Sequence, residues 1–212
     1  MPEALCNYLT LLGWSHPQET DIFTKEEIAP IFGLERFSNH AAIYDLVKLK
    51  WVNGQHLRRM PIADLIQTLS SIIPQGHPFH AQSTAWKESC VTLLKEKVDF
   101  IPEMVTMMDQ LIFDENVEMT EELKDILSWE TTPKIVSYIA TEVGKLSESF
   151  ATEAQLNVWS EHAKKELGIK GKPLFMGLRA ALTGKGHGPD LKFLIPLTPV
   201  AVLRKRAAIL GK

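Results

Sequence analysis

The sequence predicts an all-α protein, and three observations support this prediction. Apolar residues recur every three or four positions along almost the whole 212-residue chain, as they do through residues 62–73. Helix start signals precede these segments, for example the capping-box pair Thr24 and Glu27. No segment of useful length alternates between apolar and polar residues, which is the pattern of a half-buried strand. We therefore expect a bundle or cage of helices.

Each expected helix has its own start or stop signal, most often a proline or a Ser/Thr cap at the start and a glycine at the end. The expected helices are Pro2–Gly13 with a stripe of Leu5, Tyr8, Leu9 and Leu12; a short one after Thr24 that carries Ile28, Ile31 and Phe32; one from Ile43 to near Asn53 and Gly54; one from Pro61 to Ile73; a long one from Ser83 or Thr84 to Ile101, which Pro102 kinks or divides; a short one within 109–130; one opening at Thr132 and Pro133; one from Thr152 to Leu167 and Gly168; one ending at Gly184; one opening at Pro189; and a last one capped by Thr198.

Residues 174–191 are the most informative stretch of the chain. Their apolar spacing predicts a buried helix that Gly184 ends in a left-handed conformation, before a second helix opens at Pro189. Arg179, a rigid planar donor, lies among the apolar residues of the first helix. The turn between the helices also carries two further glycines with a lysine and a histidine, which are Gly186, Gly188, Lys185 and His187. An exposed helix N-terminus beside these cations is typical of a site for an anion or for base edges.

The distribution of charge points the same way. The net charge of the whole chain is −3, but residues 164–212 carry eleven Lys or Arg against Glu166 and Asp190, a net charge of +9. Residues 1–163 carry twelve basic and twenty-four acidic groups, a net charge of −12. A basic end on an acidic chain indicates a polyanionic partner, although a solvated basic surface without a partner has the same composition.

Other features exclude several classes of protein. No run of about 18 apolar residues is present, so no membrane span is expected. The N-terminus has no basic segment leading into an apolar one, and the two cysteines, Cys6 and Cys90, suggest a reducing cytoplasm without a disulfide. Phosphate-loop, dinucleotide-fold and nucleophile-elbow motifs are missing from the sequence. His77 and His80 precede Cys90, but no fourth ligand has the spacing of a zinc site, and no metal is expected.

Trp51 differs from the other tryptophans because cations surround it in the sequence, namely Lys48, Lys50, Arg58 and Arg59. An aromatic ring among cations can stack on a ribose or a base. Equally, a tryptophan at a helix end can simply cover the core. By contrast, Trp86 and Trp159 lie on apolar stripes and are expected to be core residues.

Four blocks of sequence resemble the C-terminal half of bacterial-type glutamyl-tRNA synthetases, in the family's order and over nearly the whole chain. The resemblance is specific in the first, second and fourth blocks, whereas residues 61–165 match mostly as a helical pattern. The blocks are residues 2–15, PEALCNYLTLLGWS; residues 21–24, DIFT, with Phe37 and Ser38 and residues 44–54, YDLVKLKWVNG; residues 95–100, KEKVDF; and residues 174–191, described above.

The resemblance implies a helical stem-contact region followed by an α-helical anticodon-binding cage of two subdomains. The implied boundaries are 1–60 for the stem-contact region, 61–128 for the first subdomain and 129–212 for the second. The parent enzyme joins glutamate to tRNA using ATP and Mg²⁺, which bind a catalytic domain with HIGH-type and KMSKS-type motifs. Neither motif occurs here, so the resemblance implies no catalytic residue, cofactor or metal in this chain. The implied parent is a monomeric cytoplasmic enzyme.

The resemblance also implies which residues contact tRNA(Glu) and, in some family members, tRNA(Gln). Arg179 matches an anticodon-reading arginine, and Thr183, Gly188, Pro189 and Leu191 match the turn beside the anticodon bases. Lys97 matches, to within one residue, a second anticodon-reading position where glutamate-specific members carry Arg; Lys keeps the charge but loses the planar fork. Residues expected at the tRNA stem or backbone are Lys48, Lys50, Trp51, Arg58, Lys185, Lys192, Arg204 and Lys205.

Two further departures from the family pattern are Gly177, where proline is usual, and His56, where an aromatic residue is usual. An alternative is a free-standing helical module that binds RNA or protein in a regulatory role without ligase activity. We expect part of a longer ligase instead, because the first helix begins within a family motif.

Overall fold

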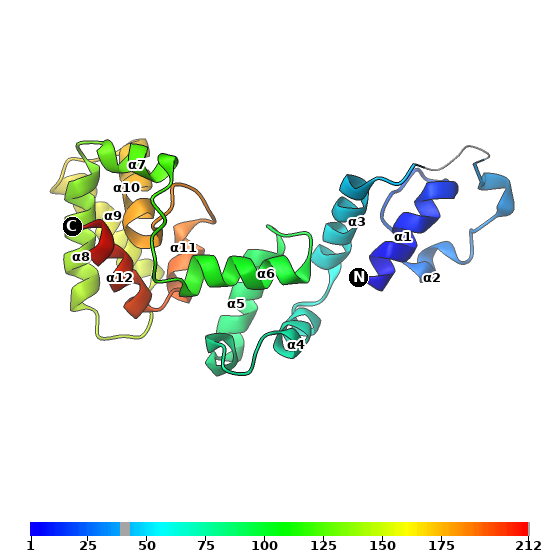
Figure 1. Cartoon of the computed structure of the whole chain (residues 1–212), viewed down its shortest axis with the longest axis horizontal. Helices are drawn as coiled ribbons and strands as arrows, with labels where there is room; N and C mark the ends of the chain where they lie inside the picture. The colour runs from blue at the N-terminus through cyan, green and yellow to red at the C-terminus, as the bar shows by residue number, and fades with distance from the viewer. Residues whose placement is uncertain (39–42, 212) are drawn as a thin grey trace. The chain divides into compact units, whose positions relative to one another are not determined.

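The computed structural model describes residues 1–38 and 43–211, and these residues fold into twelve α-helices with short 3₁₀ and π turns and no β-strand. The all-α prediction is confirmed. Backbone contacts divide the chain into two compact units, Met1–Thr106 (unit 1) and Met107–Lys212 (unit 2), and each is described by itself (Figure 1). The sequence-derived boundaries after residues 60 and 128 stay a prediction. No helix within the described residues is long and apolar enough to cross a membrane.

Unit 1 begins with two helices joined to a third by a long connection, and then continues through helical hairpins. Its helices are α1 (Pro2–Gly13), α2 (Lys25–Ile28), the 3₁₀ turn η1 (Leu34–Arg36), α3 (Leu46–Arg59), α4 (Ile62–Ile72), the 3₁₀ turn η2 (Pro78–Ala81), α5 (Thr84–Lys95) and α6 (Ile101–Met108), which ends across the boundary of unit 2.

The caps of unit 1 follow their sequence signals. Thr24 accepts a hydrogen bond from the backbone N–H of Glu27, whose side chain accepts from the Thr24 backbone, so the capping box of α2 is confirmed. The hydroxyl of Ser83 caps α5 in the expected way. The expected long helix from residue 83 is divided, because α5 ends at Lys95 and a new helix carries Pro102 in its first turn.

Three expectations for unit 1 were wrong in detail. In α1 the buried residues are Ala4, Asn7 and Tyr8, whereas Leu5 and Leu9 are exposed. The helix α2 stops at Ile28, so Ile31 and Phe32 follow it and are exposed. The helix α3 starts at Leu46 under an Asp45 cap and continues through Gly54, where the expected stop was placed. Gly54 serves instead as a point of close approach, because a Cβ there would lie 2.6 Å from Nη2 of Arg58.

Unit 2 packs its helices around one core. Its elements are the π-helical turn η3 (Asp109–Phe113), α7 (Glu121–Ser128), α8 (Thr132–Lys145), α9 (Glu153–Lys165), α10 (Gly171–Thr183), α11 (Leu191–Leu194), the 3₁₀ turn η4 (Ile195–Leu197) and α12 (Val200–Leu210).

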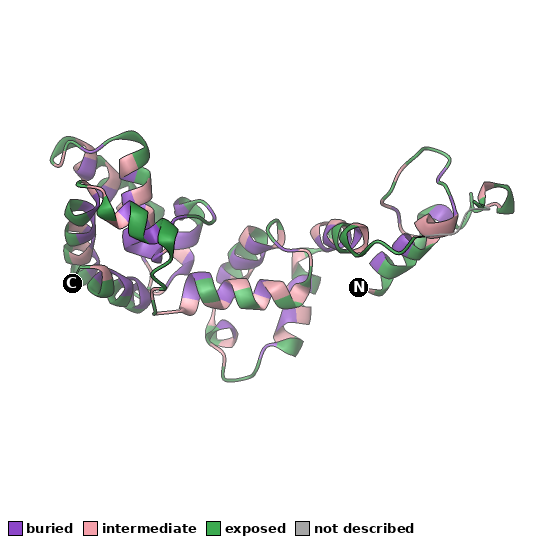
Figure 2. Ribbon diagram, turned by 45° about the horizontal axis from the view of Figure 1, so that its top comes forward, coloured by how far each residue is buried: buried purple, intermediate pink, exposed green. Residues whose placement is uncertain are grey.

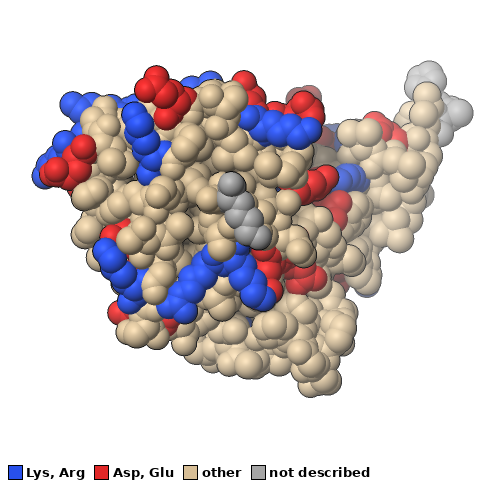
Figure 3. All heavy atoms as spheres, turned by 60° about the vertical axis from the view of Figure 1, so that its left-hand side comes forward, with Lys and Arg blue, Asp and Glu red and all other residues tan. Residues whose placement is uncertain are grey.

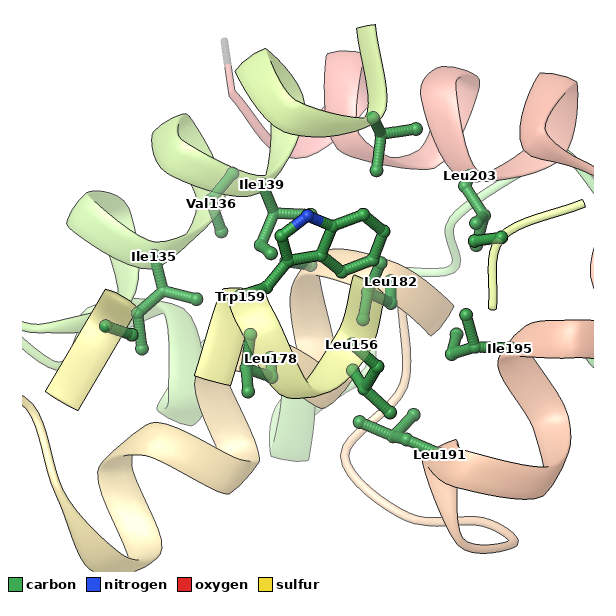
Figure 4. Packing of buried hydrophobic residues seen from close by; sticks show 14 of the residues in the cluster. Ile135, Val136, Ile139, Leu156, Trp159, Leu178, Leu182, Leu191, Ile195 and Leu203 are labelled. Carbon is green, nitrogen blue, oxygen red and sulfur yellow. The ribbon is translucent and has the colours of Figure 1, made fainter. Parts of the chain in front are cut away.

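Trp159 on α9 lies at the centre of the unit 2 core, among apolar side chains from α8, α10, α11, η4 and α12 (Figure 4). It is buried, as expected, and each large apolar side chain buried in this way contributes about 1.5–3 kcal/mol. The helices of unit 2 turn their buried faces toward one another (Figure 2). This core holds the C-terminal end of α10 and the N-terminal end of α11 in place. Residues 184–190, which belong to the most informative stretch of the sequence, connect these two ends.

The structure also corrects three expectations for unit 2. Phe175, expected on the buried stripe of α10, is 60% exposed. The hydroxyl of Thr198 donates to the carbonyl of Leu194 instead of capping α12, which begins after Pro199. The π-helical turn at Asp109–Phe113 was not expected, because a single widened turn leaves no periodic signal in the sequence.

Candidate nucleic-acid interface

Residues 184–190, here called the glycine turn, connect α10 to α11 and hold three of the predicted contact residues of unit 2, Lys185, Gly188 and Pro189. Gly184 ends α10 with φ +66° and donates its N–H to the carbonyl of Ala180 at 2.8 Å, so the left-handed helix end is confirmed. The hydroxyl of Thr183 donates to the Arg179 carbonyl at 2.7 Å and accepts the N–H of Lys185 at 3.2 Å. The buried Thr183 therefore tethers the turn to the helix.

Arg179 reaches from α10 across the glycine turn. Its Nη1 donates to the carbonyl of Pro189 at 2.9 Å, and a Cβ at Gly188, whose φ is +143°, would lie 3.3 Å from the same nitrogen. Burial lowers the pKa of Arg179, and Asp190 partly offsets this effect. The guanidinium is thus half-buried and held in orientation, while among the described residues only one of its five N–H groups is engaged.

The segment 117–122 covers the other side of the glycine turn. A Cβ at Gly184 would lie 2.8 Å from Val117, and one at Gly186 would lie 2.6 Å from a carboxylate oxygen of Glu122. The same carboxylate lies 2.7 Å from Nδ1 of His187. Side chains of segment 117–122 therefore use the close approach that these two glycines permit.

The helix N-terminus that was expected to take part in a site for an anion or for base edges lies elsewhere and is capped. The helix α11 starts at Leu191 instead of Pro189 and has only four residues. Its first N–H groups meet the side chain of Asp190, which accepts from the N–H of Lys192 at 3.0 Å. A carboxylate at this position repels a second anion, so any anion must be bound by the cationic side chains instead.

Several predicted residues in or next to the glycine turn are buried. Thr183, Pro189 and Leu191 are inside the unit, and Leu191 points into the core (Figure 4). Gly188 is exposed, and Lys185 is half-buried. The buried residues can shape the turn, whereas Arg179, Lys185 and the exposed backbone can meet a ligand.

The basic residues of α12 are divided between surface and interior. Arg204 donates from Nε to the Val143 carbonyl at 3.2 Å and from Nη2 to the Leu146 carbonyl, which caps the end of α8. Lys205 is exposed and pairs with Glu115. On the face of unit 2 seen in Figure 3, Lys and Arg side chains form separate groups with acidic side chains beside several of them.

Arg206 is buried, with 1% of its surface exposed, and sequence reasoning had counted it in the basic surface. It donates to main-chain carbonyls of Leu111, Asp114 and Leu182. Burial lowers its pKa to about 10. The net charge of +9 therefore overstates the basic surface, and Lys212, which it also included, lies outside the described residues. The available signal was helical spacing, since Arg206 follows the buried Val202 by four residues.

The predicted residues of unit 1 that lie on α3 have ion-pair partners or remain partly exposed. Lys48 lies 3.5 Å from Asp21, and Lys50 lies 3.0 Å from Glu103, whose hydrogen bond raises the pKa of Lys50. Trp51 is 41% exposed, so part of its ring is accessible to a ligand and part is buried.

Arg58 and Lys97 differ in their surroundings. Arg58 donates to the Val98 carbonyl and to Asp99 Oδ1, both at 3.1 Å. It therefore joins α3 to the residues that follow α5. Lys97 is exposed just after α5. Lys97 belongs to unit 1 and Arg179 to unit 2, so the two expected anticodon positions lie in different units.

Histidines at the predicted break between α4 and α5 have local roles. The ring of His77 accepts the N–H of Phe79 at 3.1 Å, and Nε2 of His80 lies 3.1 Å from the Ile73 carbonyl. Within the part of the chain that the structure describes, no group of three or more His, Cys, Asp or Glu side chains could hold a metal ion.

Comparison with known proteins agrees with this geometry. The model of the anticodon binding domain family matches residues 62–206, which include the glycine turn and both arginines of α12. The glutamate–tRNA ligase of Bacillus subtilis is 35% identical over 204 residues, covering 93% of this chain and 41% of the relative. That of Bdellovibrio bacteriovorus is 30% identical over 207 residues, covering 98% and 42%. The chain thus spans about two-fifths of the length of these curated relatives.

A solved glutamate–tRNA ligase from Elizabethkingia meningosepticum has the same fold over 99% of this chain and 41% of its own, with a TM-score of 0.80 and 20% identity. The enzyme from Elizabethkingia anophelis gives a TM-score of 0.76 over 99% and 40%, also at 20% identity. The chain belongs to the anticodon binding domain family and is homologous to part of the bacterial glutamate–tRNA ligases.

Proposed function

We propose that this chain recognises the anticodon loop of tRNA(Glu) as part of a glutamate–tRNA ligase. The observation that carries the proposal is the Arg179 guanidinium, which Pro189 holds in orientation at the edge of the glycine turn. A donor that is held before binding loses little conformational freedom when a base arrives. The homology to glutamate–tRNA ligases favours this proposal over a free-standing regulatory module.

The chemistry of the anticodon suits this surface. Anticodon bases are unpaired, so a protein can splay them apart and read their edges. The planar guanidinium of Arg179 can offer paired donors to the acceptor edge of a cytosine or uracil. Lys185 on the glycine turn can contact phosphates, which add affinity without sequence preference.

The remaining assignments follow from the same proposal. We assign ATP, Mg²⁺ and the joining of glutamate to tRNA to the portion of the ligase that this chain does not span. Because lysine at position 97 lacks the planar fork of arginine, we also propose that tRNA(Gln) is less strictly excluded than in an enzyme with arginine there. The proposed setting is a monomeric ligase in the cytoplasm.

A titration with tRNA transcripts tests the proposal. Arg179→Ala is expected to weaken binding of Bacillus subtilis tRNA(Glu) by about 1–3 kcal/mol, the scale of one specific base contact. The same variant should bind a transcript with a replaced anticodon base as the unmodified chain does. Filter binding at several salt concentrations measures both affinities.

Lys185→Ala is the control for a phosphate contact. It should weaken both transcripts alike and reduce the slope of log K against log salt by about 0.7–0.9. Lys205→Ala should have the same kind of effect, reduced because Glu115 already pairs with this lysine. Equal losses on both transcripts in all three variants would contradict base reading by Arg179, and the absence of any preference for the tRNA(Glu) anticodon would favour the regulatory module.

A further inference from the structure

Arg206 has an unusual environment for a buried cation. It makes no ion pair among the described residues, and its hydrogen bonds all end on main-chain carbonyls. Nε donates to Asp114 at 2.9 Å, both Nη atoms donate to Leu111 at 3.1 Å, and Nη1 also lies 3.5 Å from the Leu182 carbonyl. A buried charge is costly unless it is satisfied, so this arrangement requires an explanation.

The acceptors belong to two helix ends. Leu111 and Asp114 lie in and just after the π-helical turn η3, and Leu182 lies one residue before the end of α10. The last carbonyls of a helix have no partner within the helix and need an outside donor. One guanidinium on α12 therefore satisfies two helix ends and joins them, which a lysine with a single nitrogen cannot do in the same geometry.

The end of α10 leads into the glycine turn, and η3 borders the turn through Leu111. The side chain of Leu111 lies 4.0 Å from the position that a Cβ at Gly188 would occupy. Leu182 comes two residues before Gly184, which begins the turn. Arg179 donates to Pro189 at the far end of the same turn. Any shift of η3 relative to α10 therefore moves the surroundings of the Arg179 guanidinium.

We infer that Arg206 is a positioning residue for anticodon recognition, because it locks η3 to the end of α10 and so sets the place of Arg179. This inference rests on the proposed function of Arg179. π-Helical turns frequently occur at functional sites, and this one places Leu111 beside Gly188. Arg206 itself is buried and does not touch the RNA.

Arg204 provides a matched control for Arg206. It lies on the same helix and also donates to main-chain carbonyls, but these belong to the end of α8 and not to the glycine turn. A variant at either position loses carbonyl hydrogen bonds and stability. Only the variant at Arg206 should change the ratio of affinities for the tRNA(Glu) transcript and for a transcript with a replaced anticodon base.

The experiment compares Arg206→Lys with Arg204→Lys under conditions where circular dichroism shows both chains folded. Arg206→Lys should reduce the affinity ratio by about tenfold, within the range for one lost base contact, whereas Arg204→Lys should leave it unchanged. The NMR signal of Arg179 Nε–H, recorded without RNA, should shift in Arg206→Lys and not in Arg204→Lys. An unchanged ratio and an unchanged Arg179 signal in folded Arg206→Lys would overturn the inference.

A second variant keeps the test decisive if Arg206→Lys does not fold. Leu111→Ala retains Arg206 but removes the η3 side chain that lies beside Gly188, and it should reduce the same ratio and shift the same signal. If neither effect occurs, the inference is wrong. If Arg179→Ala leaves the ratio unchanged, the proposed function fails, and the Arg179 signal alone then decides whether Arg206 positions this side chain.

Discussion

The two units of this chain differ in how they bury their apolar side chains. Unit 2 gathers seventeen buried residues into one cluster around Trp159, whereas the buried clusters that contain α1 and α2 have three residues each. In unit 1, Ile43 and Leu34 are 85% and 81% exposed, and among the described residues of unit 2 no large apolar side chain exceeds the 63% of Val158. Helical periodicity therefore indicates which face of a helix is apolar, but not whether the fold covers that face.

The contrast extends to the polar residues. In unit 2, two arginines of α12 satisfy carbonyls at the ends of helices, Arg206 from the interior for η3 and Arg204 from the surface for α8. In unit 1, Arg58 has a comparable role between α3 and the residues after α5. Some of the positively charged side chains of this chain therefore stabilise the fold by binding main-chain carbonyls. A count of basic residues consequently overstates the basic surface.

The largest effect should come from emptying the centre of the unit 2 core. Trp159→Ala is expected to lower the free energy of unfolding of unit 2 by about 3–5 kcal/mol, because it leaves a large cavity. Trp51→Ala in unit 1 should cost less, about 1–2 kcal/mol, since this ring is 41% exposed and removes less apolar surface from water. Hydrogen exchange of α8 and α10 amides, compared with α3 amides, measures each unit separately. Similar losses from both variants would remove the contrast between the units.

A smaller effect should come from tightening the contact between α10 and α8. A Cβ at Gly177 would lie 2.5 Å from Cδ1 of Ile135, so Gly177→Ala should cost about 1–3 kcal/mol by overpacking. This contact also gives a physical reason for glycine at the position where the resembled family usually has proline. Chemical denaturation of the single variant measures the cost.

Two further variants sharpen the result at Gly177. Ile135→Val removes the obstructing Cδ1, so the double variant should be more stable than the sum of the two single losses predicts. Gly144→Ala is the matched control, because a Cβ there has open space, and it should be neutral or stabilising by up to about 1 kcal/mol. A loss from Gly177→Ala that persists in full in the Ile135→Val background would exclude this contact as its cause.

Local chemistry made the helices predictable. Thr24, Ser83, Thr152 and Gly184 end or begin helices as their sequence neighbours indicate, because a cap needs only residues three or four positions away. The helix expected in the first part of residues 174–191 was likewise confirmed, as α10. The start of α11 two residues after Pro189 also has a local cause, since Asp190 directly precedes the helix and caps it.

The surroundings of the candidate site could not be predicted in the same way. Arg206 and Leu111 are 95 positions apart, and Glu122 and His187 are 65 positions apart, so nothing local in the sequence pairs them. The two cysteines show the same limit on the scale of one helix: Cys6 is exposed on α1, whereas Cys90 on α5 is buried, and burial raises its pKa to about 12. Contacts between distant segments decide which residues are buried, whereas periodicity indicates only which residues could be buried.

The smallest effect should be a pH dependence confined to unit 1. His56 on α3 is buried with Nε2 2.8 Å from Oδ1 of Asn7, which also accepts the N–H of Phe23. Burial lowers the pKa of His56, and Arg59 lowers it further. Between this lowered pKa and the ordinary value of 6.5, the unfolded chain binds more protons than the folded chain. The contribution of neutral His56 to stability is therefore complete above pH 6.5 and is lost as the pH falls through the folded pKa.

Hydrogen exchange of α1 and α3 amides at pH 7.5 and at lower pH values, corrected for the intrinsic exchange rate, measures this loss. His56→Gln keeps an amide donor for Asn7 but does not titrate, so it should flatten the pH dependence of unit 1. The amides of α8 and α10 in unit 2 serve as the internal reference, because the His56 contacts lie within unit 1. A variant that retains the full pH dependence would show that a group other than His56 causes it.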